Sequence, residues 1–208
     1  MKPVCFLLVL FSSSAFAAQT PLYSDVKNFL KHSPDKRPRV FQAYGHRGKS
    51  TLAEMAFNSK ESLEVRWDAL VTLGRIDSKF AKPHLEKALV SSDWFMRNAA
   101  LIVVSYGERD WAIQKARLAL HDPALVVRTA AVKVLSDLKA TEAKPLLWEK
   151  INSSENFKRG QSLWIRPLIA QALVDLAQPE DKEAFQKLLK DRDGQVQKAA
   201  QLALASLR

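Results

Sequence analysis

The sequence has a single cysteine, Cys5, which lies within a short apolar run over residues 4–11. One basic residue, Lys2, precedes the run, and small residues at Ala15 and Ala17 follow it. This order of parts is typical of a secretory signal peptide, which we predict over residues 1–17 with cleavage before Ala18. The alternative is a buried N-terminal strand or helix. A cleaved chain would have no cysteine, which excludes disulfides, thiolate metal sites and cysteine nucleophiles.

Long hydrophobic runs are also missing from the sequence. The N-terminal run is too short to span a bilayer, and no later stretch is long and apolar enough to do so. We therefore predict no membrane span, and a mature protein that is periplasmic or secreted.

Recognisable catalytic patterns are scarce. The segment "GHRGKS", residues 45–50, lacks the spacing of a phosphate-binding loop, and no serine lies in a nucleophile elbow. The spacing of the four histidines does not match a metal site; they are His32, His46, His84 and His121. We predict no catalytic residue, no cofactor and no metal.

Charge is spread unevenly along the chain, whose formal net charge is +10. Residues 18–49 hold seven Lys or Arg against Asp25 and Asp35, whereas residues 50–208 hold 24 basic and 20 acidic residues. We predict that residues 18–48 form a basic N-terminal cap of short helices or, alternatively, an open linker. Such a segment could bind a polyanion, although solvated charge is the simpler explanation.

An internal repeat dominates the rest of the sequence. Arginine recurs at the head of similar apolar segments, at Arg66, Arg97, Arg128 and Arg166, and Gln197 takes the same position in the last one. The intervals are 31, 31, 38 and 31 residues, and the polar stretch 152–161 is the expected place for the seven extra residues.

Each repeat contains two predicted helices. Apolar residues stand one position before, three after and seven after the marked residue, which places them on one face of a helix. A more charged amphipathic helix precedes each of these segments, and turn residues such as those of "HDPALV" separate the two. We predict an all-α solenoid of about five helix-turn-helix repeats over residues 49–208.

The segment "HDPALVVRTAAVKVLSDL" within a 31-residue unit resembles the short bacterial HEAT-like repeat found in phycobilisome lyases. The resemblance implies a ladder in which the marked arginine of one repeat pairs with a turn aspartate of the next. The turn aspartates that match are Asp93, Asp122, Asp191 and Asp193. We therefore expect Arg66, Arg97, Arg128 and Arg166, with Asp122, to be structural links between repeats rather than ligand contacts.

A predicted binding surface lies on the second helix of each pair, which lines the inner surface in HEAT-like arrays. Positions one, five and nine after the marked residue face away from the core. Over the first two repeats these positions are rich in apolar and aromatic residues, which are typical of partner sites. The candidate partner-binding residues are Trp67, Val71, Arg75, Ile102, Tyr106 and Lys133.

The alternative is that this patch is covered, either because the N-terminal segment folds back over it or because the array curves tightly enough to bury it. Periodicity does not distinguish between the two. We expect the other tryptophans to fill space between helices; they are Trp94, Trp111, Trp148 and Trp164.

The function that these features favour is a non-catalytic adaptor that binds a protein or peptide on its inner surface. The alternative is a binder of an anionic envelope polymer through the basic N-terminal segment. The resemblance also implies a bilin-lyase-type enzyme, for which no residue here supplies the chemistry. The export signal argues against nucleic acid as a partner.

Overall fold

The computed structural model describes residues 21–31 and 44–207. The predicted signal peptide, its cleavage site and most of the basic N-terminal segment lie outside these residues. None of the described helices has the length and apolar character needed to cross a membrane.

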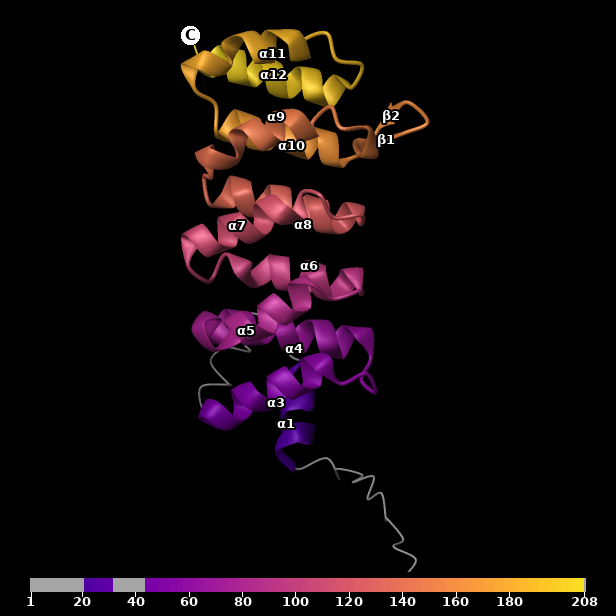
Figure 1. Cartoon of the computed structure of the whole chain (residues 1–208), viewed down its shortest axis with the longest axis vertical. Coiled ribbons are helices and arrows are strands. Elements are labelled where there is room, and N and C mark those ends of the chain that lie inside the picture. The colour runs from indigo at the N-terminus through magenta and orange to yellow at the C-terminus, as the bar shows by residue number, and fades with distance from the viewer. Residues whose placement is uncertain (1–20, 32–43, 208) are drawn as a thin grey trace, which may run out of the picture.

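The described chain is almost entirely helical, and most of it forms helix pairs stacked in sequence order (Figure 1). The first helices of the pairs are α3 (Gly45–Phe57), α5 (Ser78–Leu89), α7 (Arg109–Ala119), α9 (Lys144–Lys150) and α11 (Lys182–Leu188). The second helices are α4 (Leu63–Ile76), α6 (Trp94–Val104), α8 (Leu125–Asp137), α10 (Ile165–Asp175) and α12 (Gly194–Ser206). The predicted all-α solenoid of about five repeats is confirmed, and its first helix begins at Gly45, before residue 49.

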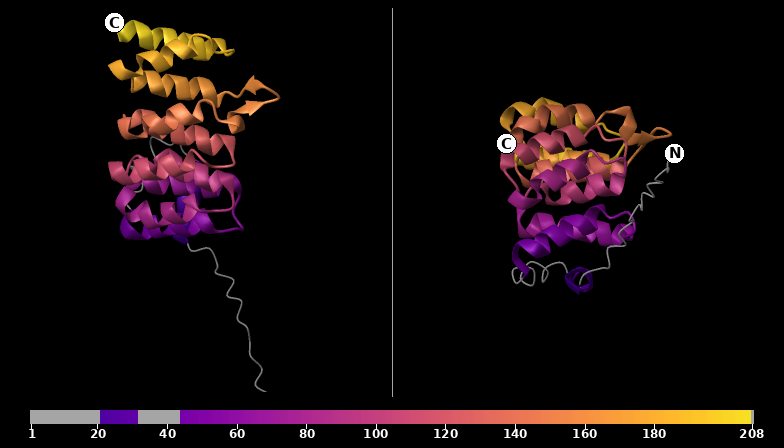
Figure 2. Two further views of the ribbon diagram at one scale, coloured as in Figure 1. Left: turned by 45° about the horizontal axis from the view of Figure 1, so that its top comes forward. Right: turned by 60° about the horizontal axis from the view of Figure 1, so that its bottom comes forward.

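The second helices form a continuous layer along the array. Each packs directly on the next, in the order α4, α6, α8, α10 and α12. The views in Figure 2 show the pairs stacked along one axis. We call the solvent side of this layer the second-helix face; it corresponds to the inner surface expected from the sequence.

Small residues permit the close approach of neighbouring second helices. The alanines three positions after the marked residue, Ala69, Ala100, Ala131 and Ala200, are all fully buried. At Gly74 the approach is closer still, since a Cβ atom there would lie 2.5 Å from a methyl group of Val103. The repeat spacing of the sequence is thus matched by the packing of the helices.

The first helices differ in length along the array. Two of them are short and follow single turns of 3-10 helix, η2 (Thr141–Ala143) before α9 and η4 (Pro179–Asp181) before α11. A buried ion pair joins these two units, because Lys144 Nζ lies 2.7 Å from Asp181 Oδ2.

A separate helix, α1 (Pro21–Phe29), packs on α3 at the N-terminal end of the array. The Tyr23 hydroxyl donates to Glu61 Oε1 at 3.0 Å and accepts a hydrogen bond from the Asn58 side-chain amide at 3.0 Å. Lys27 forms an ion pair with the other oxygen of Glu61 at 2.7 Å. Burial raises the pKa of Tyr23 to about 12. The first residues after the predicted cleavage site therefore contain a packed helix.

The insertion predicted at residues 152–161 forms a small protrusion from the fourth pair (Figure 1). It consists of η3 (Ser154–Asn156) and an antiparallel hairpin of β1 (Phe157–Lys158) and β2 (Gln161–Ser162). The two turn residues, Arg159 and Gly160, have φ values of 52° and 75°, as the tightest hairpin turns require.

Candidate functional site

Arg97 links the second and third repeats. Its guanidinium donates two hydrogen bonds to the carboxylate of Asp122, at 2.6 and 2.8 Å. It also donates to the carbonyl oxygens of Ser91 and Ser92 in its own turn, at 2.7 and 3.0 Å. Asp122 in turn accepts from the backbone N–H of Ala124 at 2.8 Å. One side chain thus holds two turns and the start of the next second helix together.

Arg128 makes an equivalent link without an aspartate. Its Nε donates to Asn156 Oδ1 at 3.2 Å, and its terminal nitrogens donate to backbone carbonyls of Asp122, Pro123 and Glu155. Asn156 is fully buried and donates to the Lys150 carbonyl at 2.8 Å. The insertion supplies a neutral acceptor in place of the aspartate.

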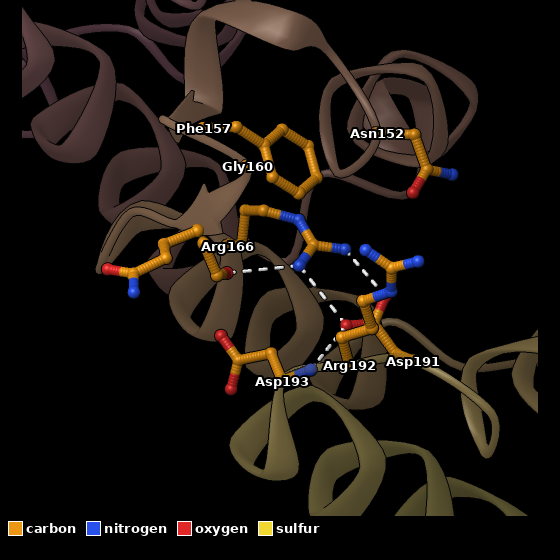
Figure 3. Close-up of a pocket in the computed structure, with 9 residues that line it drawn as sticks. Asn152, Phe157, Gly160, Arg166, Asp191, Arg192 and Asp193 are labelled. Carbon is orange, nitrogen blue, oxygen red and sulfur yellow. Dashed lines mark hydrogen bonds and ion pairs between the residues drawn. The ribbon is translucent and has the colours of Figure 1, made fainter.

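Arg166 is the most buried of the marked arginines, at 2 % exposure. It donates to both oxygens of Asp191, at 3.2 and 2.6 Å, and to the Ile151 carbonyl at 2.7 Å. The Phe157 ring of the hairpin covers the guanidinium at 4.4 Å (Figure 3). A cavity of about 570 Å³ lies beside this group. Arg166 and Asp191 neutralise each other, and the other charged residues that line the cavity are Arg192 and Asp193.

Arg66 is held more loosely than the other three. Its nearest carboxylate oxygen, on the half-exposed Asp93, is 3.7 Å away, and its Nε donates to the Ala56 carbonyl at 3.3 Å. The Phe95 ring lies 5.0 Å from the guanidinium. In the next repeat, the residue that corresponds to Asp122 is Ser91, six positions before Arg97, and it has no carboxylate.

The paired aspartates keep their charge to lower pH than free ones. Burial alone would raise the pKa of Asp122, but hydrogen bonds from Arg97 and from the Ala124 amide outweigh it and hold that pKa below its usual range. Asp191 shows the same balance, with Arg166 and the Asp193 amide as the donors that lower its pKa. These carboxylates are suited to structural pairing and not to proton transfer.

The predicted partner-binding residues do not form a single exposed patch. Val71, expected to face solvent, is 3 % exposed. It belongs to an apolar cluster that includes Tyr23 and Val26 of α1 and the adjacent Leu30, which we call the N-terminal cluster. Trp67 packs against the same cluster. The prediction that Val71 is an exposed contact residue is therefore wrong, because the N-terminal cluster encloses this part of α4.

The other predicted residues lie in different surroundings. Arg75 is partly buried, and its Nε has no hydrogen-bond partner in the part of the chain that the structure describes. Tyr106 is half exposed near the end of α6. Ile102 and Lys133 alone among the six line a groove on the second-helix face.

This groove, of about 540 Å³, crosses the second-helix face between α6 and α10, with α8 as its floor. Ile102 of α6 forms one wall, and Trp164 and Leu168 of the α10 segment form the other. All three are exposed, at 37 %, 51 % and 42 % respectively. The floor contains Thr129, Ala130 and Lys133 among others. Exposed Trp, Leu and Ile side chains grouped in one groove are typical of protein contact sites.

Sequence reasoning missed Trp164 and Leu168. Trp164 was expected to fill space between helices, and Leu168 was not considered. They stand two positions before and two positions after the marked Arg166. At about 100° per residue, Trp164 falls within the sector that the outward positions occupy, and Leu168 falls about 20° beyond its edge. Including the positions two before and two after the marked residue among those predicted to face solvent would have identified both residues.

Two acidic residues stand at one end of the groove, Asp137 at the end of α8 and Asp175 at the end of α10. Lys133 lies 3.0 Å from Asp137. Asp175 accepts hydrogen bonds from the Ser136 hydroxyl at 2.8 Å and from Gln171 at 3.2 Å. The groove therefore has an apolar centre and an acidic end.

The basic N-terminal segment offers fewer free cations than its sequence suggested. Lys27 is paired with Glu61, and Lys49 lies 2.7 Å from Asp77 at the start of α5. The basic residues Lys36, Arg37 and Arg39 lie outside the described part of the chain. Arg47 is exposed, and the polyanion alternative stays a prediction.

Comparison with known proteins relates the fold to helical repeat proteins. No family model and no curated protein matches the sequence. A designed armadillo repeat protein in complex with the peptide (KR)4 aligns with a TM-score of 0.59 and 16% identity, over 89% of this chain and 91% of that one. A second designed armadillo repeat protein aligns with a TM-score of 0.56 and 16% identity, over 89% of this chain and 92% of that one.

The complex of CpcE and CpcF of phycocyanin lyase from Nostoc sp. PCC7120 aligns with a TM-score of 0.50 and 17% identity, over 89% of this chain and 76% of that chain. At such identities the likeness shows the fold alone. Together with the stacked helix pairs and the regular spacing of the marked residues, it identifies the fold as that of a HEAT-like repeat protein.

Proposed function

We propose that this protein is a non-catalytic adaptor that binds a segment of another protein in the groove of the second-helix face. The observation that carries the proposal is the convergence of exposed Ile102, Trp164 and Leu168 on one concave surface. Burying these side chains against a partner would supply most of the binding free energy, since large apolar and aromatic residues dominate protein contacts.

The comparisons support a scaffold function in general terms. One of the designed armadillo repeat proteins is in complex with a peptide. CpcE and CpcF of phycocyanin lyase are likewise in complex with each other. Within the described residues we find charged pairs that stabilise turns and no arrangement suited to catalysis.

Site-specific photocrosslinking tests this proposal. A benzophenone amino acid at Leu168, 42 % exposed in the groove, should crosslink a protein in cells that express the tagged chain. The same amino acid at Leu118, 65 % exposed on α7, is the control outside the groove. The identified partner should then bind the purified protein, and Trp164→Ala should weaken that binding while Trp94→Ala leaves it unchanged.

The two tryptophans are well matched for this control, since they are 51 % and 53 % exposed and each stands at the start of a second helix. Equal crosslinking at Leu168 and Leu118, or equal effects of the two tryptophan substitutions, would rule out the groove as the binding site.

We further propose that the protein acts in the periplasm or outside the cell, on the basis of the signal-peptide pattern in residues 1–17. Mass spectrometry of the purified native protein should then give an N-terminus at Ala18. A mature protein that retains Met1 or Lys2 would contradict export by this route.

A further inference from the structure

We infer that the segment bound in the groove carries a lysine or arginine beside apolar residues, with its cationic group at Asp137 and Asp175. This inference rests on the proposed function and adds the chemistry of the partner. It follows from the position of the two carboxylates, from the charges around them and from the length of the groove.

The ends of two helix dipoles meet at the acidic end of the groove. Each second helix follows a first helix that runs back across the array, so α8 and α10 run in the same direction (Figure 1). The hydrogen bond from Ser136 to Asp175, at 2.8 Å, shows that their C-terminal ends lie side by side. A helix C-terminus carries a partial negative charge, which disfavours a carboxylate and favours a cation there.

The sequence nevertheless places a carboxylate at the C-terminal end of each of these two helices. Asp137 is the last residue of α8 and Asp175 the last of α10, and neither helix has a basic residue in its last turn. Two carboxylates and two helix ends therefore concentrate negative potential on one side of the groove.

The protein compensates only part of this charge. Lys133 pairs with Asp137 in an exposed contact between residues four apart on α8. Asp175 accepts hydrogen bonds from two neutral groups, the hydroxyl of Ser136 and the amide of Gln171. A cationic side chain of the partner would pair with Asp175 and relieve the repulsion between it and Asp137.

The apolar walls of the groove indicate the length and the apolar character of the rest of the bound segment. Trp164 stands just before α10 and Asp175 ends it, so about 16 Å of helix axis separates them. An extended chain covers this distance with about five residues. The bound segment should place apolar side chains against Trp164, Leu168 and Ile102, with its basic residue near one end.

Fluorescence anisotropy with labelled peptides of roughly eight residues tests the inference. One peptide combines leucine and lysine, and in two others of the same length glutamine or glutamate replaces every lysine. The lysine peptide should bind about tenfold more tightly than the glutamine peptide at low salt, and the difference should shrink at high salt. The glutamate peptide should bind least.

Two substitutions locate the effect. Asp175→Asn should remove most of the preference for lysine, whereas Asp110→Asn, at a carboxylate on α7 that is 98 % exposed, should leave it unchanged. Trp164→Ala should weaken the lysine and glutamine peptides alike. Circular dichroism should show the same helical content in all variants, because each substituted side chain is exposed.

The outcomes separate this inference from the proposed function. Equal binding of the lysine and glutamine peptides, lost in Trp164→Ala, would overturn the inference and leave the adaptor function in place. A preference for lysine that survives Asp175→Asn would place the cation elsewhere and also overturn it. If no peptide binds and Leu168 crosslinks no protein, both proposals fail.

Discussion

The first repeat and the fourth repeat use the same sequence positions in different ways. At the marked position, Arg66 is 3.7 Å from its nearest carboxylate oxygen, whereas Arg166 makes two hydrogen bonds to Asp191 and is covered by Phe157. On the second-helix face, α4 has its apolar residues enclosed by the N-terminal cluster, whereas the α10 segment leaves Trp164 and Leu168 open. The environment supplied by neighbouring segments therefore decides the role of each repeated position.

The largest effect is expected from a charge introduced into the enclosed part of this face. Val71→Asp would bury a carboxylate in the N-terminal cluster and should lower the free energy of unfolding by about 4 kcal/mol. Ile102→Asp, at the open groove, should change it by less than about 1 kcal/mol. Urea denaturation followed by circular dichroism measures both. Equal losses would show that the two positions are equally enclosed.

A second prediction compares the two arginines. Arg166→Ala leaves Asp191 without its cation in a poorly solvated turn and should cost about 3 kcal/mol of unfolding free energy. Arg66→Ala should cost about 1 kcal/mol, since its partner Asp93 is half exposed. The same denaturation experiment applies. An equal or larger loss for Arg66→Ala would mean that its packing on Phe95 matters more than its ion pair.

The hairpin gives a third, smaller effect. Asn156→Ala removes the neutral acceptor of Arg128 and the donor to the Lys150 carbonyl, and should cost about 2 kcal/mol. Asn152→Ala, at an exposed neighbour, should be neutral within about 0.5 kcal/mol. Thermal melts of the two variants decide the matter, and a neutral Asn156→Ala would mean that backbone carbonyls alone satisfy Arg128.

The smallest expected effect is a dependence on pH. Because the pKa values of Asp122 and Asp191 are lowered on folding, their contribution is fully present above their ordinary value of 3.8 and is lost as pH falls through the lowered values. As the pH is lowered from about 4 to about 2, the unfolding free energy of the double variant Asp122→Asn/Asp191→Asn should therefore fall by less than that of the wild type. Urea denaturation curves at several pH values in this range measure the difference. Parallel curves would indicate that other carboxylates dominate acid unfolding.

The repeat architecture could be predicted from the sequence because it depends on local spacing. Apolar residues at fixed offsets from Arg66, Arg97 and Arg128 specify which side of each helix is buried. The regular 31-residue interval then fixes the stacking of successive pairs. The fold follows from these two regularities.

The surface could be predicted only in part. Periodicity assigned Val71 and Ile102 to the same outward sector, but it carries no information about which segment lies over that sector. Asn156 shows a related limit. Its side chain accepts a hydrogen bond from Arg128, as an aspartate does from the marked arginine in other repeats. Because Asn156 belongs to an insertion that has no counterpart in the other repeats, comparing the repeats could not identify it.

The hairpin turn at Arg159 and Gly160 has a practical consequence for engineering. The array already accommodates seven additional residues at this point without losing the stacking of its helices, and the turn is exposed to solvent. Longer loops cost little additional closure entropy, so a fluorophore-binding tag inserted between these two residues should be tolerated. Since the turn is four residues from Trp164 along the chain, comparing the fluorescence of such a tag with and without a bound peptide would show whether it reports groove occupancy.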